Sequence, residues 1–138
     1  MQSLETLVTA LSPSLKTMGY RKNKLTWYKK KEKLSVVFVV QKSQYSPDVW
    51  YYCFGIRLHD ISNTTTDSIS ACQIQYRVEQ KVNGVCLTEE HLSNLLEKWE
   101  EKYGNLRQLR ICAIENKMPG MPTRDAVRYL TTVNVSTI

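Results

Sequence analysis

The sequence predicts an α+β fold: a mostly antiparallel sheet of four or five strands, with an N-terminal helix and C-terminal helices packed on its apolar face. Apolar residues recur every three or four positions at the start of the chain and again after Thr88, as in amphipathic helices. Between these segments apolar and polar residues alternate, as in half-buried strands, with turn-forming residues separating the runs. The length of 138 residues fits one domain over residues 1–138.

The first predicted element is a helix that ends at Gly19, a residue free to adopt the positive φ of a helix C-terminus. Pro13 falls inside this helix and lacks the N–H that a helix interior needs. We therefore expect either a kink or two short helices, the second capped by Ser12. The apolar stripe consists of Leu4, Leu7, Val8, Leu11, Leu15 and Met18.

Two strands are predicted next. Residues 20–30 are expected to form a single strand, followed by a turn at residues 31–33. The strand over residues 34–43 carries apolar side chains on both faces. This pattern favours a central position in the sheet.

Residues 50–58 show the clearest alternation in the chain and predict a third strand. Residues 60–70 are rich in Thr, Ser, Asn and Asp and predict a loop, and residues 72–79 predict a fourth strand with one polar face. The inward rows of these strands should form one core with the N-terminal helix. The expected members include Phe38, Phe54, Ile74, Leu7 and Leu11.

Thr88 is placed to cap a helix that runs to Tyr103 and has acidic residues in its first turn. The apolar stripe of this helix consists of Leu92, Leu95, Leu96 and Trp99. Residues 106–114 fit a short helix slightly better than a buried strand. Residues 118–122 are expected to form a loop, and Thr123 to cap a last helix. For residues 131–138 we expect an extended edge or a frayed end.

The strongly apolar, charge-free runs, residues 36–40 and 50–56, are far shorter than the ~20 residues of a membrane span. The first ten residues carry Glu5 and no basic segment, so we expect no signal peptide and no membrane association. The four cysteines lack metal-site spacing, and we expect reduced thiols in a cytoplasmic protein. They are Cys53, Cys72, Cys86 and Cys112.

No catalytic residue, metal ligand or cofactor is assigned from the sequence. Acyl-transfer chemistry needs a histidine beside a nucleophile, and the two histidines, His59 and His91, fit isolated surface positions better. The five glycines are isolated, which excludes a glycine-rich phosphate loop.

One enzymatic alternative is a metal-dependent phosphodiesterase that uses a Glu-x-Lys pair, in which acids hold Mg²⁺ and the lysine contacts the phosphate. Glu115 and Lys117 follow an apolar segment and match this pattern. Residues 79–81 and 100–102 match it as well, and about one such pair is expected by chance from the composition. Coincidence is the better explanation.

The positive charge is concentrated in residues 16–33, which hold eight of the 19 basic residues and one of the 13 acidic residues. Such a basic hairpin could bind nucleic acid, although lysine is a poorer bidentate phosphate ligand than arginine. A solvated, lysine-rich pair of strands is the preferred interpretation. The patch comprises Lys22, Lys24, Lys29, Lys30, Lys31 and Lys33.

Polar and tyrosine side chains on the predicted sheet form a candidate surface for binding another protein. An ordinary solvated or helix-covered face explains the same residues slightly better. Among functions, we prefer a non-catalytic protein-binding module of an immunity-like or regulatory kind, and the sequence assigns no oligomeric state. The candidate residues are Tyr28, Gln41, Ser43, Tyr45, Tyr51, Gln73, Gln75 and Arg77.

Four short segments carry a resemblance to known sequences: residues 19–22 (Gly-Tyr-Arg-Lys), 25–28 (Leu-Thr-Trp-Tyr), 41–46 (Gln-Lys-Ser-Gln-Tyr-Ser) and 54–56 (Phe-Gly-Ile). Their order resembles a bacterial family of domains of unknown function, with an N-terminal helix, a Gly-aromatic-Lys-Lys strand and a strand that ends in Gln-Lys-Ser. The resemblance covers residues 2–60 well and 70–80 loosely. It implies the fold and carries no established activity.

Overall fold

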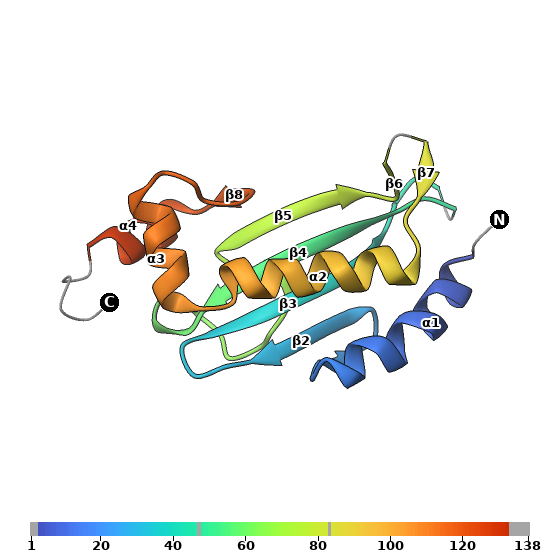
Figure 1. Cartoon of the computed structure of the whole chain (residues 1–138), viewed down its shortest axis with the longest axis horizontal. Helices are drawn as coiled ribbons and strands as arrows, with labels where there is room; N and C mark the ends of the chain where they lie inside the picture. Colours follow the sequence, from blue (N-terminus) through green and yellow to red (C-terminus); the bar gives the residue numbers. More distant parts are fainter. Residues whose placement is uncertain (1–2, 47, 83, 133–138) are drawn as a thin grey trace.

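The computed structural model describes residues 3–46, 48–82 and 84–132, which form an α+β fold with four α-helices around an antiparallel sheet (Figure 1). The helices are α1 (Leu4–Thr17), α2 (Glu89–Tyr103), α3 (Leu106–Ile114) and α4 (Arg124–Thr131). The strands are β1 (Arg21–Asn23), β2 (Thr26–Lys30), β3 (Leu34–Lys42), β4 (Trp50–Leu58), β5 (Ile74–Glu79), β6 (Lys81–Val82), β7 (Val85–Cys86) and β8 (Met121–Pro122).

Within the described residues the main sheet has six strands in the order β1-β2-β3-β4-β5-β8, and every neighbouring pair is antiparallel. The sheet is therefore slightly larger than the predicted four or five strands. Strands β6 and β7 form a separate two-stranded hairpin. The predicted central position of β3 is confirmed, because β2 and β4 flank it.

One additional strand arises because residues 20–30 form a hairpin and not the single strand that we expected. Lys24 has a φ of 57° and turns the chain, so that Asn23 pairs with Thr26 and Lys22 with Trp27. A positive φ is uncommon for lysine, and the sequence carries no Asn-Gly or Gly-Gly signal there.

The other additional strand is β8, which lies in the segment 118–122 that we expected to be a loop. Met121 and Pro122 pair with Gln75 and Ile74. Gly120 permits this pairing: its φ is +55°, and a Cβ added to it would lie 2.0 Å from the Gln75 carbonyl oxygen. Only a glycine fits such a close backbone approach.

Helix α1 is continuous from Leu4 to Thr17, so the alternative of two short helices is wrong. Ser12 does not cap a second helix, because its hydroxyl donates to the Val8 carbonyl within α1. Ser3 is the N-cap and accepts a hydrogen bond from the Thr6 N–H.

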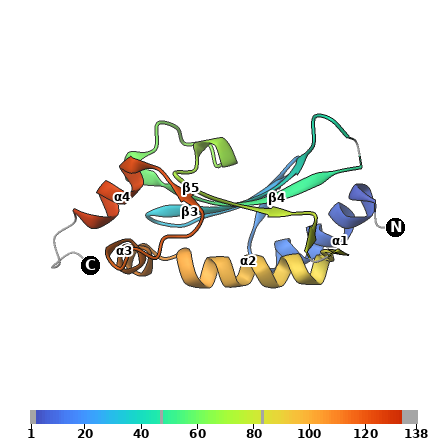
Figure 2. The same ribbon diagram turned by 90° about the horizontal axis from the view of Figure 1, so that it is seen from above.

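Helix α2 runs along one face of the sheet, and the connection from β4 to β5 lies on the opposite side (Figure 2). The core lies between the sheet and the helices, and the predicted grouping of Phe38, Phe54 and Ile74 with Leu7 and Leu11 is confirmed. Helices α2, α3 and α4 add buried side chains to the same core, including Leu92, Leu96, Trp99, Leu109, Ala126 and Leu130.

The face of the sheet opposite α2, here called the outer face, carries a second buried cluster. It explains why β3 is apolar on both sides. Its members are Val37, Val39, Cys53 and Cys72.

The predicted helix over residues 106–114 is confirmed, as are the caps Thr88 and Thr123. Thr131 is the last residue of α4, and residues 133–138, for which we expected an extended or frayed end, lie outside the described residues. None of the helices in the described part of the chain has the length and apolar character to cross a membrane.

Candidate functional site

The strand register places five of the eight predicted surface residues on the outer face. Tyr51 lies opposite Gln41, and Val37, a member of the outer cluster, lies opposite Tyr28. Gln75 and Arg77 share this face because they lie opposite Gly55 and Cys53 of β4. The Arg77 guanidinium lies 3.6 Å from the centre of the Tyr51 ring, a close cation–π contact.

The side-chain amides of Gln73 and Gln75 form hydrogen bonds with backbone groups of neighbouring segments. Gln73 Oε1 accepts a hydrogen bond from the Leu58 N–H at 2.8 Å, and Gln75 Nε2 donates to the carbonyls of Ile69 and Cys72. These contacts hold the connection from β4 to β5 over part of the outer face. The two amides act there as structural groups.

Ser43 and Tyr45 lie away from the outer face, in the connection between β3 and β4. Tyr45 is 94% exposed and faces an open depression beside Leu4 and Val8 of α1. The predicted surface is thus divided between the outer face and this connection.

A buried ion pair anchors the connection from β4 to β5 on the outer face. Arg57 Nε lies 2.7 Å from Asp67 Oδ1, with both side chains at most 4% exposed, and Arg57 Nη1 donates to the Thr64 carbonyl. Beneath the connection, burial and the charge of Asp67 raise the pKa of Cys72 to about 12. Burial likewise raises the pKa of Cys53. Both groups are therefore protonated thiols near neutral pH.

The lysines of the basic hairpin do not form one continuous surface. Lys29 and Lys31 reach Glu100 of α2, whereas Lys30 lies 3.9 Å from Asp67. The remaining three patch lysines are exposed; the ammonium of Lys22 lies over the Trp27 ring, and the other two are Lys24 and Lys33.

Glu100 links α2 to the basic hairpin. Its carboxylate accepts hydrogen bonds from Tyr20 Oη and Lys29 Nζ, each at 2.9 Å, and Lys31 Nζ lies 3.0 Å away. Burial alone would raise the pKa of Glu100, but these hydrogen bonds hold it below its ordinary value. Burial, followed by the charge of Glu100, raises the pKa of Tyr20.

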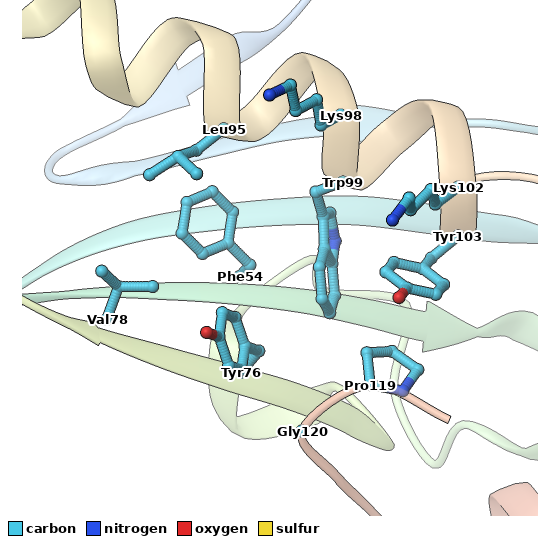
Figure 3. Close-up of a pocket in the computed structure, with 10 residues that line it drawn as sticks. All are labelled: Phe54, Tyr76, Val78, Leu95, Lys98, Trp99, Lys102, Tyr103, Pro119 and Gly120. Atoms are coloured by element: carbon cyan, nitrogen blue, oxygen red, sulfur yellow. The ribbon is translucent and has the colours of Figure 1, made fainter. Parts of the chain in front are cut away.

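A pocket of about 320 Å³ lies between α2, β5 and the segment that precedes β8 (Figure 3). Its aromatic wall is tightly arranged: the rings of Tyr76 and Trp99 stack at 6.1 Å and 11°, and Tyr103 meets Trp99 edge-on at 4.9 Å. Trp99 Nε1 donates to the Gly55 carbonyl at 3.4 Å, which orients the indole. The remaining lining residues are Phe54, Val78, Leu95, Lys98, Lys102, Pro119 and Gly120.

This pocket, here called the aromatic pocket, exposes apolar surface beside positive charge. Tyr76 is 47% and Leu95 37% exposed. Lys98 and Lys102, one turn apart on α2, stand at its rim, and none of its lining residues in the described part of the chain is acidic. The arrangement suits an apolar group that carries negative charge beside it.

Sequence reasoning missed the aromatic pocket. It assigned Leu95 and Trp99 to the apolar stripe of a helix and Phe54 to the inward row of a strand, which is correct for each element alone. One signal was available in the sequence. Leu95, Trp99 and Tyr103 are spaced four residues apart, so they form an apolar row that extends the buried stripe of the helix to an exposed position at Leu95.

Two of the three Glu-x-Lys pairs and both histidines make side-chain contacts that account for them structurally. Glu115 and Lys117 form an exposed ion pair at 3.7 Å, and Glu100 is held by the hairpin lysines. His59 Nε2 is 2.9 Å from Ser35 Oγ, and His91 completes the capping box of α2. Residues 3–46, 48–82 and 84–132 contain no group of three or more His, Cys, Asp or Glu able to hold a metal ion.

The family model Domain of unknown function (DUF4304) matches residues 11–118. The chain belongs to this family. The DUF4304 match spans β1 to β5, α2 and α3, and it includes eight of the ten residues that line the aromatic pocket. The expected membership of a family of domains of unknown function is thereby confirmed. No curated protein and no solved structure matches the chain significantly.

Proposed function

We propose that this DUF4304 protein is a non-catalytic protein-binding module, immunity-like or regulatory in kind, and that the aromatic pocket is its docking site. The observation that carries the proposal is the half-exposed ring of Tyr76, stacked on the buried Trp99, beneath the cationic rim of Lys98 and Lys102. Tyr and Trp in ordered, partly exposed pockets are the side chains most often responsible for binding energy at protein interfaces.

The volume of the aromatic pocket limits its occupant. About 320 Å³ lies at the small end of the range for ligand sites, which suits one bulky apolar side chain better than a whole cofactor. The lysines favour a partner whose anchoring side chain has carboxylates nearby. The occupant is therefore an apolar residue of an acidic protein segment.

The alternatives from the sequence have less support. For nucleic-acid binding, Lys29 and Lys31 are engaged by Glu100, which leaves fewer free charges for phosphates. For a phosphodiesterase, Glu115 has Lys117 as its ion-pair partner and is not among the residues that line the aromatic pocket.

A random-peptide display selection tests the proposal. Peptides are enriched on the wild-type protein, and their affinities are then measured by fluorescence anisotropy for wild type and for Leu95→Glu. We expect enriched sequences with a bulky apolar residue next to acidic residues, and an affinity at least about tenfold lower for Leu95→Glu.

The matched control is Ile114→Glu, which changes another exposed apolar residue on a helix, 58% exposed, that does not line the pocket. It should bind like wild type. Failure to enrich any peptide, or equal loss of affinity in both variants, would overturn the proposal. Thermal melts establish that both variants are folded.

A further inference from the structure

We infer that the partner segment binds as an additional β-strand along the open edge of β5, an inference that rests on the protein-binding function proposed above. The observation is a difference between the two sides of β5. On one side, β4 pairs with all six residues from Ile74 to Glu79. On the other side, within the described chain, β8 pairs only with Ile74 and Gln75.

The backbone of β5 offers hydrogen-bonding groups at this open edge. In an antiparallel ladder, successive residues direct their N–H and C=O groups to opposite sides. The Gln75 carbonyl faces Gly120, on the β8 side. Arg77 and Glu79 lie two and four residues after Gln75, so their N–H and C=O groups point to the same edge of β5 as those of Gln75. They lie beyond the end of β8.

The side chains of the intervening residues face the aromatic pocket. Tyr76 and Val78 line it, and α2 forms the opposite wall through Leu95 and Trp99. A strand added to β5 would direct every second side chain between β5 and α2. Strand addition of this kind takes affinity from main-chain hydrogen bonds and specificity from pockets for alternate side chains.

The edge is short. It is limited at one end by β8 and at the other by the β6–β7 hairpin, where Leu87 N–H donates to the Gln80 carbonyl. The open stretch is therefore residues 76–79. An incoming strand would pair over roughly four residues, and one side chain would enter the aromatic pocket.

Charge identifies the occupant as an acidic, extended segment of another protein. Lys98 and Lys102 stand on the wall across from β5, so carboxylates beside the anchoring residue would be attracted. A second copy of this chain fits poorly, because edge-to-edge pairing of two β5 strands would bring both lysine pairs to one seam, and the chain carries a net charge of +6.

The test uses an acetylated eight-residue peptide with a central phenylalanine, flanking valines and threonines, and glutamates at both ends. Binding to the full-length protein is followed by ¹H–¹⁵N spectra and amide hydrogen exchange. We expect saturable protection of the Arg77 and Glu79 amides, whereas the amides of Tyr76 and Val78, already directed at β4, should change little.

Backbone N-methylation of the peptide, one residue at a time, provides the second readout. We expect affinity to fall about tenfold or more at every second position and to remain unchanged between them, because only alternate amides face β5. Reversing the rim charge with Lys98→Glu and Lys102→Glu should weaken binding at least about fivefold. Lys33→Glu, an exposed lysine outside the pocket, is the charge control and should bind like wild type.

The outcomes separate the two proposals. Binding that depends on Leu95 but shows neither the alternating N-methyl pattern nor protection at Arg77 and Glu79 overturns strand addition and leaves the docking pocket in place. No binding by this peptide or by any displayed peptide overturns both. Concentration-dependent protection of these amides without peptide identifies a second copy as the occupant and overturns the inference.

Discussion

Tyr76 of β5 stacks on Trp99 of α2 with their ring planes 11° apart, and this pair joins the edge of the sheet to the helix that covers it. The two rings differ in burial: Trp99 is 6% exposed and Tyr76 47%. Trp99 also contacts Phe54 and Tyr103. The stacked pair therefore combines a core residue with a surface residue, and the two should respond differently to substitution.

We expect Trp99→Ala to lower the free energy of unfolding by ~3–5 kcal/mol, because it leaves a cavity between α2 and the sheet. Tyr76→Ala should cost roughly 1 kcal/mol, since much of this ring is already in water. Urea denaturation of both variants measures the difference. Equal losses of stability would contradict the assignment of Trp99 to the core and Tyr76 to the pocket surface.

Gly120→Ala should release β8 from β5. The positive φ and the 2.0 Å approach to the Gln75 carbonyl leave no room for a methyl group. Hydrogen exchange should accelerate at the Thr123 amide, which donates to the Gln73 carbonyl at 2.8 Å.

Gly84→Ala is the matched control for Gly120→Ala. Gly84 also has a positive φ, +79°, but has nothing within 4 Å of an added Cβ. It should cost only the backbone strain, roughly 1–2 kcal/mol, and leave the Thr123 amide protected. Unchanged exchange in Gly120→Ala would show that β8 does not depend on this glycine.

Glu100 should make the stability of the protein depend on pH. Its pKa is lower in the folded state than in the unfolded chain, so the folded state binds its proton less readily. The stabilisation is therefore complete above the unfolded value of about 4.3 and is lost as pH falls through the folded pKa. The stability difference between wild type and Glu100→Gln should shrink as pH is lowered from about 6 to about 2.

The measurement for Glu100 is the free energy of unfolding in urea across this pH range. Glu101→Gln, an exposed neighbour on the same helix, is the control and should parallel wild type. A Glu100→Gln variant that keeps a constant difference from wild type at all pH values would contradict the role given to Tyr20, Lys29 and Lys31.

The basic hairpin should retain DNA or RNA only weakly, at low salt and without sequence preference. Each phosphate contact contributes a slope of about −0.9 in log affinity against log salt, and little binding should remain at ~150 mM salt. Fluorescence anisotropy at two salt concentrations measures this. The triple variant Lys22→Ala, Lys24→Ala and Lys33→Ala, which leaves the Glu100 contacts intact, should remove the low-salt retention. Sub-micromolar binding at physiological salt that the triple variant abolishes would favour the nucleic-acid alternative.

Local patterns in the sequence were sufficient for much of the fold. The alternation in residues 50–58 and the stripe after Thr88 mark β4 and α2, because side-chain periodicity and capping act within one element. The shared core of Phe38, Phe54 and Leu11 follows from the same logic, since apolar faces must be buried against one another.

Contacts between distant segments were decided only by the tertiary structure. The turn at Lys24 and strand β8 depend on partners elsewhere in the sheet that override weak local signals. Lys29 and Lys31 of the basic hairpin contact Glu100, some 70 residues further along the chain, whereas Lys30 lies near Asp67. The aromatic pocket likewise arises only when β5, α2 and the segment before β8 meet. Sequence periodicity reports which face of an element is buried, whereas the distance between two elements is determined by packing in three dimensions.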